Sequence, residues 1–132
     1  MKVFIGSDHA GFKSKEFIKN FNFFETYGLN IDFIDVGTYN EQRCDYPDVA
    51  KKLIKLLKRC IPFKKTATQN VFGILICGTG IGMCMQANKF KKIRAVVCND
   101  LNSAIISRQH NNANVLCLGA RVINNQEMIK II

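Results

Sequence analysis

Cys77 is the side chain in this sequence whose surroundings best suit chemistry. It ends an apolar run, Phe72–Cys77, and precedes a turn with glycines at positions 78, 80 and 82. Glycine lets backbone amides approach a ligand closely, and the helix predicted after the turn favours negative charge at its start. A thiolate beside such donors suits proton abstraction next to a carbonyl, because the amides can hold the resulting oxyanion. Thr79 adds a hydroxyl that can carry a proton to that oxygen.

The spacing of these glycines excludes two nucleotide-binding motifs. A dinucleotide fingerprint requires Gly-x-Gly-x-x-Gly, but Met83 stands where the third glycine belongs. The phosphate loop of nucleoside-triphosphate enzymes requires Lys after its last glycine, and Gly82 is followed by Met83 instead. Two alternatives stay open, a tight turn with a buried cysteine and a thiol hydrolase that pairs Cys77 with His110.

Both histidines stand at the ends of predicted elements, which favours a catalytic interpretation of the Cys77 turn. His9 follows Asp8 after the first predicted strand, and His110 precedes Asn111 at the end of a predicted helix. Asp8 is a candidate for catalysis or, equally, a helix cap, whereas Asp45 is interpreted mainly as a cap.

Length and charge limit the class of protein. The 132 residues fit one domain, and no apolar run approaches the roughly 20 residues of a membrane helix. The amino terminus is too short and too soon polar for a signal peptide, so we expect a cytoplasmic protein with no membrane partner. The net charge of +9 comes without a recognisable nucleic-acid module, so we expect no nucleic-acid partner. A basic surface would still attract a phosphorylated metabolite.

The six cysteines do not suggest a metal or disulfide framework. No Cys-x-x-Cys pair occurs, which argues against zinc ribbons and thioredoxin-like sites. Cys60, Cys84, Cys98 and Cys117 fall in apolar patterns and are predicted to be small core residues.

Strand-like and helical patterns alternate along the whole chain. Strands are predicted at Lys2–Ser7, Ile31–Val36, Phe72–Cys77, Ile93–Cys98 and Ala113–Leu118. Helices are predicted at Phe12–Tyr27, from Asp45 to about Cys60, after Gly82 to about Phe90, and at Asp100–His110 and Asn125–Ile132. This alternation predicts one α/β domain over residues 1–132, a Rossmann-like three-layer sandwich with a five-stranded parallel sheet. A long loop is expected over Arg59–Asn70.

Ligands of such sheets bind beyond the carboxyl ends of the strands. That rule selects four segments, at Gly6–Gly11, Cys77–Gly82, Asn99–Asp100 and Gly119–Arg121.

Five motifs occur in an order that resembles the ribose-5-phosphate isomerase type B family, which includes galactose-6-phosphate isomerase subunits. They are Ser7-Asp8-His9-Ala10-Gly11-Phe12, Asp45-Tyr46-Pro47-Asp48, Cys77-Gly78-Thr79-Gly80-Ile81-Gly82-Met83, Ala87-Asn88-Lys89 and Arg108-Gln109-His110-Asn111. The resemblance implies a sugar-phosphate isomerase that needs no metal or other cofactor and interconverts ribose 5-phosphate and ribulose 5-phosphate through an enediolate.

The resemblance also implies roles for individual residues. Cys77 would move the proton between C1 and C2, and His110 would open the sugar ring with help from Asp8. Thr79 would handle the C1 oxygen, His9 and Arg121 would approach the phosphate, and Asn111 would bind a sugar hydroxyl. The implied substrate-binding residues are Asp8, His9, Gly78, Thr79, Gly80, Ile81, Gly82, Asn111 and Arg121, the glycine-loop amides forming an anion hole.

The resemblance also implies an obligate homodimer or homotetramer. Its active site would take the Cys loop from one subunit and the residue equivalent to His110 from the next. Members of the family also continue past the position of Ile132 with a Gly-Gly-Arg-His segment and a further Arg that hold the phosphate, and this sequence ends before that segment. Hexose-6-phosphate isomerisation and non-catalytic phosphosugar binding are therefore alternative functions.

Overall fold

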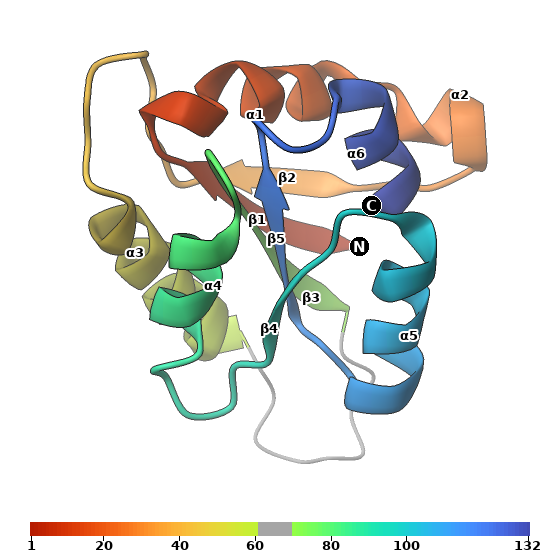
Figure 1. Cartoon of the computed structure of the whole chain (residues 1–132). Coiled ribbons are helices and arrows are strands. Elements are labelled where there is room, and N and C mark those ends of the chain that lie inside the picture. The colour runs from red at the N-terminus through yellow and green to blue at the C-terminus, as the bar shows by residue number, and fades with distance from the viewer. Residues whose placement is uncertain (61–69) are drawn as a thin grey trace.

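The structure is a computed structural model that describes residues 1–60 and 70–132, and a five-stranded sheet forms its centre (Figure 1). Its strands are β1 (Lys2–Ser7), β2 (Asp32–Asp35), β3 (Val71–Cys77), β4 (Ala95–Val97) and β5 (Val115–Gly119). They lie in the order β2-β1-β3-β5-β4, and every neighbouring pair is parallel. The predicted parallel α/β sandwich is therefore confirmed.

Helices cover both faces of the sheet and complete the three layers. They are the short 3-10 helix η1 (His9–Gly11) and α1 (Phe12–Asn20), α2 (Phe23–Tyr27), α3 (Tyr46–Cys60), α4 (Ile81–Ala87), α5 (Leu101–Asn111) and α6 (Asn125–Ile131). Figure 1 shows α3 and α4 together on one side of the sheet, with α5 and α6 on the other. No helix in the described ranges combines the length and apolar character needed to cross a bilayer.

The two faces of the sheet pack into two separate cores, because side chains alternate along each strand. On β3, Leu75 and Cys77 join the core beneath α3 and α4. Ile74 and Ile76, between them, join the core beneath α1, α5 and α6. The side chain of Cys77 therefore belongs to the α3–α4 face.

The helix predicted over Phe12–Tyr27 is wrong as a single element. The chain leaves helical geometry at Phe21, whose backbone is extended (φ −75°, ψ 134°). Asn22 then caps α2 by accepting a hydrogen bond at 3.1 Å from the amide of Glu25. An Asn side chain that bonds the backbone locally favours a new helix start over continuation of the old one. As a result Phe23 is buried, while Phe24 is 68% exposed.

The prediction for the cysteines is correct only in part. Cys98 and Cys117 are buried, Cys84 is half-buried, and Cys60 is exposed. Leu53 and Leu57 of α3 pack against the sheet, but Cys60 is the last residue of that helix and lies beyond the packed stripe. Arg59 and Cys60, which were predicted to lie in a long loop, belong to α3 instead, and residues 61–69 of that predicted loop lie outside the described part of the chain.

Candidate active site

The loops that follow β1 and β3 lie at the point where the chain changes direction across the sheet. The strands β1 and β3 are neighbours in the sheet. After β1 the chain continues to β2 on one side of this pair, and after β3 it continues to β4 on the other side. In open α/β sheets this point forms a crevice at the carboxyl edge, where ligands bind. The loop after β1 carries Asp8 and His9, and the loop after β3 begins at Cys77.

Cys77 faces a backbone donor of its own loop. The amide of Gly80 lies 3.1 Å from the Cys77 Sγ and donates a hydrogen bond to it, and Cys77 is 5% exposed. Gly80 has a φ of +78°, and a Cβ at this residue would lie 3.1 Å from the backbone of Leu118. Glycine is thus required for the turn that aims this amide at the sulfur. Thr79 is exposed, and its hydroxyl accepts a bond at 3.3 Å from the amide of Ile81.

Arg121 lies directly over the same loop. The amides of Ala120 and Arg121 donate to the carbonyls of Cys77 and Gly78 at 2.8 and 2.9 Å, which fixes the end of β5 against the turn. The guanidinium crosses Gly78 so closely that a Cβ there would lie 3.3 Å from Nη1. Within residues 1–60 and 70–132 no carboxylate forms an ion pair with Arg121, so its exposed charge can meet an anionic ligand.

Asp8 caps the short helix that follows it. Its Oδ1 accepts from the amides of Ala10 and Gly11 at 2.9 and 3.1 Å, and the residue is 7% exposed. The interpretation of Asp8 as a cap is confirmed, and its catalytic role stays a prediction.

His9 is held by the main chain of a second loop, between β2 and α3. Its Nδ1 lies 3.3 Å from the carbonyl oxygen of Cys44 and 3.4 Å from the amide nitrogen of the same residue. The ring donates to the carbonyl in one tautomer and accepts from the amide in the other. In both cases Nδ1 is engaged by protein, which leaves Nε2 as the nitrogen for a ligand.

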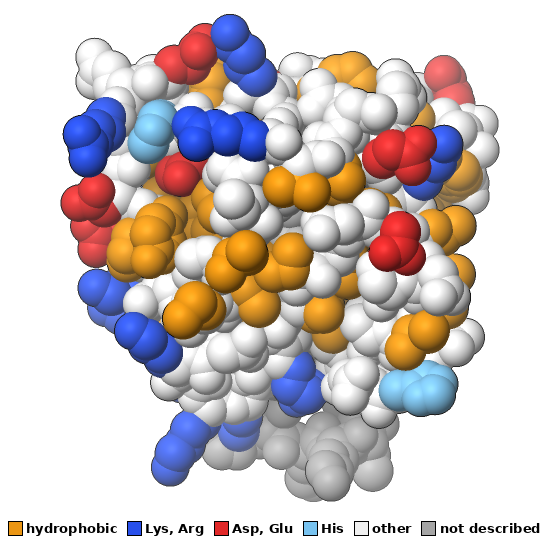
Figure 2. Space-filling view, viewed as in Figure 1, with side chains coloured by type: hydrophobic (Ala, Val, Ile, Leu, Met, Phe, Trp, Pro, Cys, Tyr) orange, Lys and Arg blue, Asp and Glu red, His pale blue; other side chains and the backbone are white. Residues whose placement is uncertain are grey.

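His110 and Asn111 lie at the other edge of the sheet. The eleven residues of α5 run from the carboxyl edge back towards the start of β5, a rise of about 16 Å. Figure 2 shows the two histidine side chains at opposite ends of one face. Both His110 and Asn111 are exposed at the end of α5. His110 is therefore remote from Cys77 within one chain, and its predicted role beside the Cys loop of a neighbouring subunit stays a prediction.

A family model described as Ribose/Galactose Isomerase matches residues 3–132. The chain belongs to this family. The ribose-5-phosphate isomerase B of Escherichia coli is 40% identical over 131 residues, a match that covers 99% of this chain and 79% of that protein. The structure is also similar to ribose-5-phosphate isomerase B of Clostridium thermocellum, with a TM-score of 0.82, 39% identity and coverage of 99% and 80% of the two chains. The Mycoplasma genitalium enzyme, whose crystal structure has ribulose-5-phosphate bound, gives a TM-score of 0.81 at 39% identity and covers 98% and 79%.

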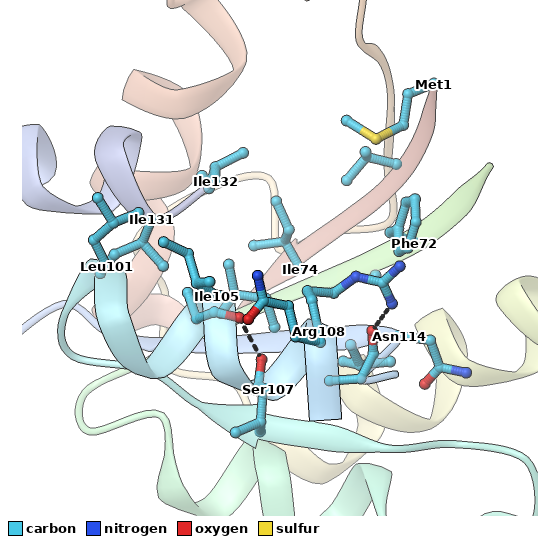
Figure 3. Close-up of a pocket in the computed structure, with 18 of the residues that line it drawn as sticks. Met1, Phe72, Ile74, Leu101, Ile105, Ser107, Arg108, Asn114, Ile131 and Ile132 are labelled. Atoms are coloured by element: carbon cyan, nitrogen blue, oxygen red, sulfur yellow. Dashed lines mark hydrogen bonds between the residues drawn. The ribbon is translucent and has the colours of Figure 1, made fainter. Parts of the chain in front are cut away.

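A prominent cavity in the described part of this isomerase lies away from the Cys77 loop. A groove of about 460 Å³ opens between α5 and the end of the chain, over the first residues of β1, β3 and β5 (Figure 3). Met1, Phe72, Ile105 and Ile131 contribute to a mainly apolar lining, and Arg108 supplies charge. The groove lacks Cys77, His9 and Arg121, so it is separate from the candidate active site, which consists of the loops at the carboxyl edge of the sheet.

The described part of the isomerase shows no cluster of three or more His, Cys, Asp or Glu side chains arranged for a metal.

Two groups of interest were missed by the sequence analysis. Lys15 is fully buried and forms an ion pair with Asp35. The sequence signal for its burial was its position three residues before Ile18, on the inner face of α1. The pKa of Cys84 is lowered to about 7, mainly by the side chain of Cys117. No sequence signal marks that pair, because it joins α4 to β5.

Proposed function

We propose that this isomerase interconverts ribose 5-phosphate and ribulose 5-phosphate, with Cys77 as the base. The observation that supports this most directly is the amide of Gly80 aimed at the Cys77 sulfur from 3.1 Å. A hydrogen bond from an amide stabilises negative charge on sulfur, which is the form that removes a proton. The names of the Escherichia coli and Mycoplasma genitalium relatives suggest the substrate pair.

The reaction requires only the transfer of protons. The Cys77 thiolate removes the proton from C2 of the open-chain aldose, and the electron pair of that bond forms the enediolate. The same group returns the proton to C1, while the Thr79 hydroxyl moves a proton from O2 to O1. The amides of the loop from Gly78 to Gly82 hold the negative oxygen. No external oxidant or reductant is needed, because C1 is reduced as C2 is oxidised.

The phosphate group is proposed to lie near Arg121 and His9. Arg121 presents its guanidinium over Gly78, next to the reacting sulfur. The Nε2 of His9 offers a second donor from the loop after β1. Charge-assisted hydrogen bonds of this kind contribute roughly 1.5–3 kcal/mol each.

His110 and Asn111 are proposed to act in the active site of a second copy of the chain. They cannot reach Cys77 of their own chain from the far end of α5. Large apolar side chains are exposed on α4, next to the Cys77 loop, and on α5, which carries His110. The exposed fractions are 55% and 66% for Ile81 and Met85 of α4, and 43% and 42% for Ile105 and Ile106 of α5. Exposed apolar side chains grouped in this way are typical of a protein–protein interface.

Turnover of ribose 5-phosphate tests the proposal. Cys77→Ala is expected to lower kcat by at least the roughly 10²–10⁴-fold that a general base supplies. Its thermal unfolding should stay cooperative, which separates lost chemistry from lost structure. Equal activity of the wild type and Cys77→Ala would refute the role of the sulfur, and a wild type without turnover would favour phosphosugar binding alone. Parallel assays with allose 6-phosphate and galactose 6-phosphate distinguish the hexose alternative.

Mixing two inactive variants tests the shared site. Cys77→Ala and His110→Ala subunits should each be inactive alone. In a random mixture half the dimers are heterodimers with one intact site out of two, so about a quarter of the wild-type activity should return. If no activity returns and the protein is monomeric in solution, the shared site is wrong.

A further inference from the structure

The ammonium group of Lys15 is buried beneath the loop that joins β2 to α3. The Lys15 side chain is 0% exposed, and its Nζ lies 2.8 Å from both carboxylate oxygens of Asp35. It donates a further bond at 2.6 Å to the carbonyl of Thr38, and it lies 5.2 Å from the ring centroid of Tyr39. A lysine is rarely buried so completely unless its charge is paired, and burying it is costly.

The loop that Lys15 holds also contacts the candidate active site. At its start, Gly37 and Thr38 exchange backbone hydrogen bonds of 2.7 Å with Ser7, the residue before Asp8. At its far end, the main chain of Cys44 engages the Nδ1 of His9. The bond from Lys15 to Thr38 thus lies at one end of a segment whose other end orients the imidazole.

Lys15 anchors the start of the loop together with Asp35, whose Oδ1 also accepts a hydrogen bond at 2.9 Å from the amide of Gly37. The nearby pair of Lys13 and Glu41, at 3.3 Å, has side chains 78% and 58% exposed, and such surface pairs contribute little. Lys19 also bonds Asp35, at 2.6 Å, but no bond joins it to the loop among the described residues. Lys15 is therefore the lysine that couples Asp35 to Thr38.

We propose that Lys15 is a positioning residue for phosphate binding, which acts through Thr38 and the loop to Cys44 and so fixes the imidazole of His9. This rests on the proposed function for the identity of the ligand. The geometric part, that Lys15 controls the environment of His9, is independent of any reaction.

Lys15→Met is the test variant, and Lys19→Met is its matched control. Both remove one ammonium group from Asp35 and leave the other in place, but only Lys15→Met removes the donor to Thr38. With ribose 5-phosphate, Lys15→Met should raise KM about tenfold and change kcat less than about twofold, because it weakens ground-state binding. Lys19→Met should stay within twofold in both constants.

A double-mutant cycle tests whether the effect passes through His9. If it does, Lys15→Met should raise KM no further in a His9→Ala background, because the residue it positions is gone. Fully additive effects on KM would overturn the proposal.

A spectroscopic measurement keeps the proposal testable without turnover. The chain has two histidines, so the His9 and His110 imidazole resonances can be assigned with a single His110→Ala variant. In the full chain, Lys15→Met should shift the His9 ring carbon resonances and leave those of His110 unchanged, and Lys19→Met should shift neither. Lys15→Met should also weaken the binding of inorganic phosphate, whereas Lys19→Met should not. Unmoved His9 resonances would refute the positioning role, whereas absent wild-type turnover with shifted resonances would refute only the proposed function. If Lys15→Met does not fold, Lys15→Gln, whose amide can still donate to Thr38, should give a smaller shift of the same resonances.

Discussion

Gly11→Ala should damage both the stability and the activity of this isomerase, because the glycine packs directly on the strand that carries Cys77. A Cβ at Gly11 would lie 2.6 Å from the carbonyl oxygen and 2.8 Å from the carbonyl carbon of Ile76. Both atoms are backbone at the centre of the sheet, so they cannot rotate away. Relief from 2.6 Å to an ordinary contact of 3.4 Å requires a displacement of about 0.8 Å.

The size of the effect follows from that displacement. Overpacking against rigid backbone costs about 3 kcal/mol, at the upper end of the usual range. For a domain of this size, that loss corresponds to a decrease in Tm of about 10 °C. The shift also moves Asp8 and His9 relative to Cys77, and a misplacement near 1 Å lowers kcat/KM by up to about 10²-fold.

Thermal unfolding and turnover of ribose 5-phosphate, measured on the same preparation, test both effects. Gly28→Ala serves as the control, since Gly28 has a φ of +67° but nothing within 4 Å of its Cβ position. The control should lose about 1–2 kcal/mol from left-handed strain and keep its catalytic constants. Wild-type Tm and turnover in Gly11→Ala would show that the loop after β1 does not pack against β3 in this way.

Two further predictions concern titratable groups. A hydrogen bond with Cys117 lowers the pKa of Cys84 to about 7; burial opposes this shift, and hydrogen bonds from the Val97 backbone and the Asn88 side chain add to it. Alkylation of Cys84 by iodoacetamide, followed by peptide mass spectrometry, should therefore rise with pH around a midpoint near 7, and a midpoint near 9 would contradict this. Burial would raise the pKa of Asp35, but the hydrogen bonds from Lys15, Lys19 and the Gly37 amide outweigh it and lower the pKa below its usual value. A lowered carboxyl pKa adds stability above about pH 4, the unfolded value, which is lost as the pH falls through the folded pKa. The difference in urea stability between wild type and Asp35→Asn should thus shrink below about pH 4, and a constant difference from pH 6 to pH 3 would refute it.

The sheet and the Cys77 loop were predictable from sequence because their signals are local. Buried parallel strands are short apolar runs, and the turn after Cys77 is marked by glycines, one of which adopts a φ of +78°. Both features depend on a few adjacent residues. The same reasoning placed Arg121 at the carboxyl edge, where it lies over Gly78.

The remaining features depend on contacts between distant segments. The bond from Lys15 to Thr38 spans 23 residues, and the contact of His9 with Cys44 spans 35. The position of His110 depends on the direction of α5, which carries it away from the carboxyl edge. The break after Asn20 was missed for another reason, because Phe17, Phe21 and Phe24 keep a helical spacing that the cap at Asn22 overrides.

The order of the strands has a consequence for synthesis on the ribosome. Among the described residues β4 pairs only with β5, and β5 also completes the ladder with β3. Since β5 is translated last of the five, a nascent chain that stops before Val115 leaves the carbonyls and amides of Ala95–Val97 without a ladder. Strands β1, β2 and β3 can pair early. Two of the four strand pairs, β3–β5 and β4–β5, form together in one late step, when β5 inserts between β3 and β4.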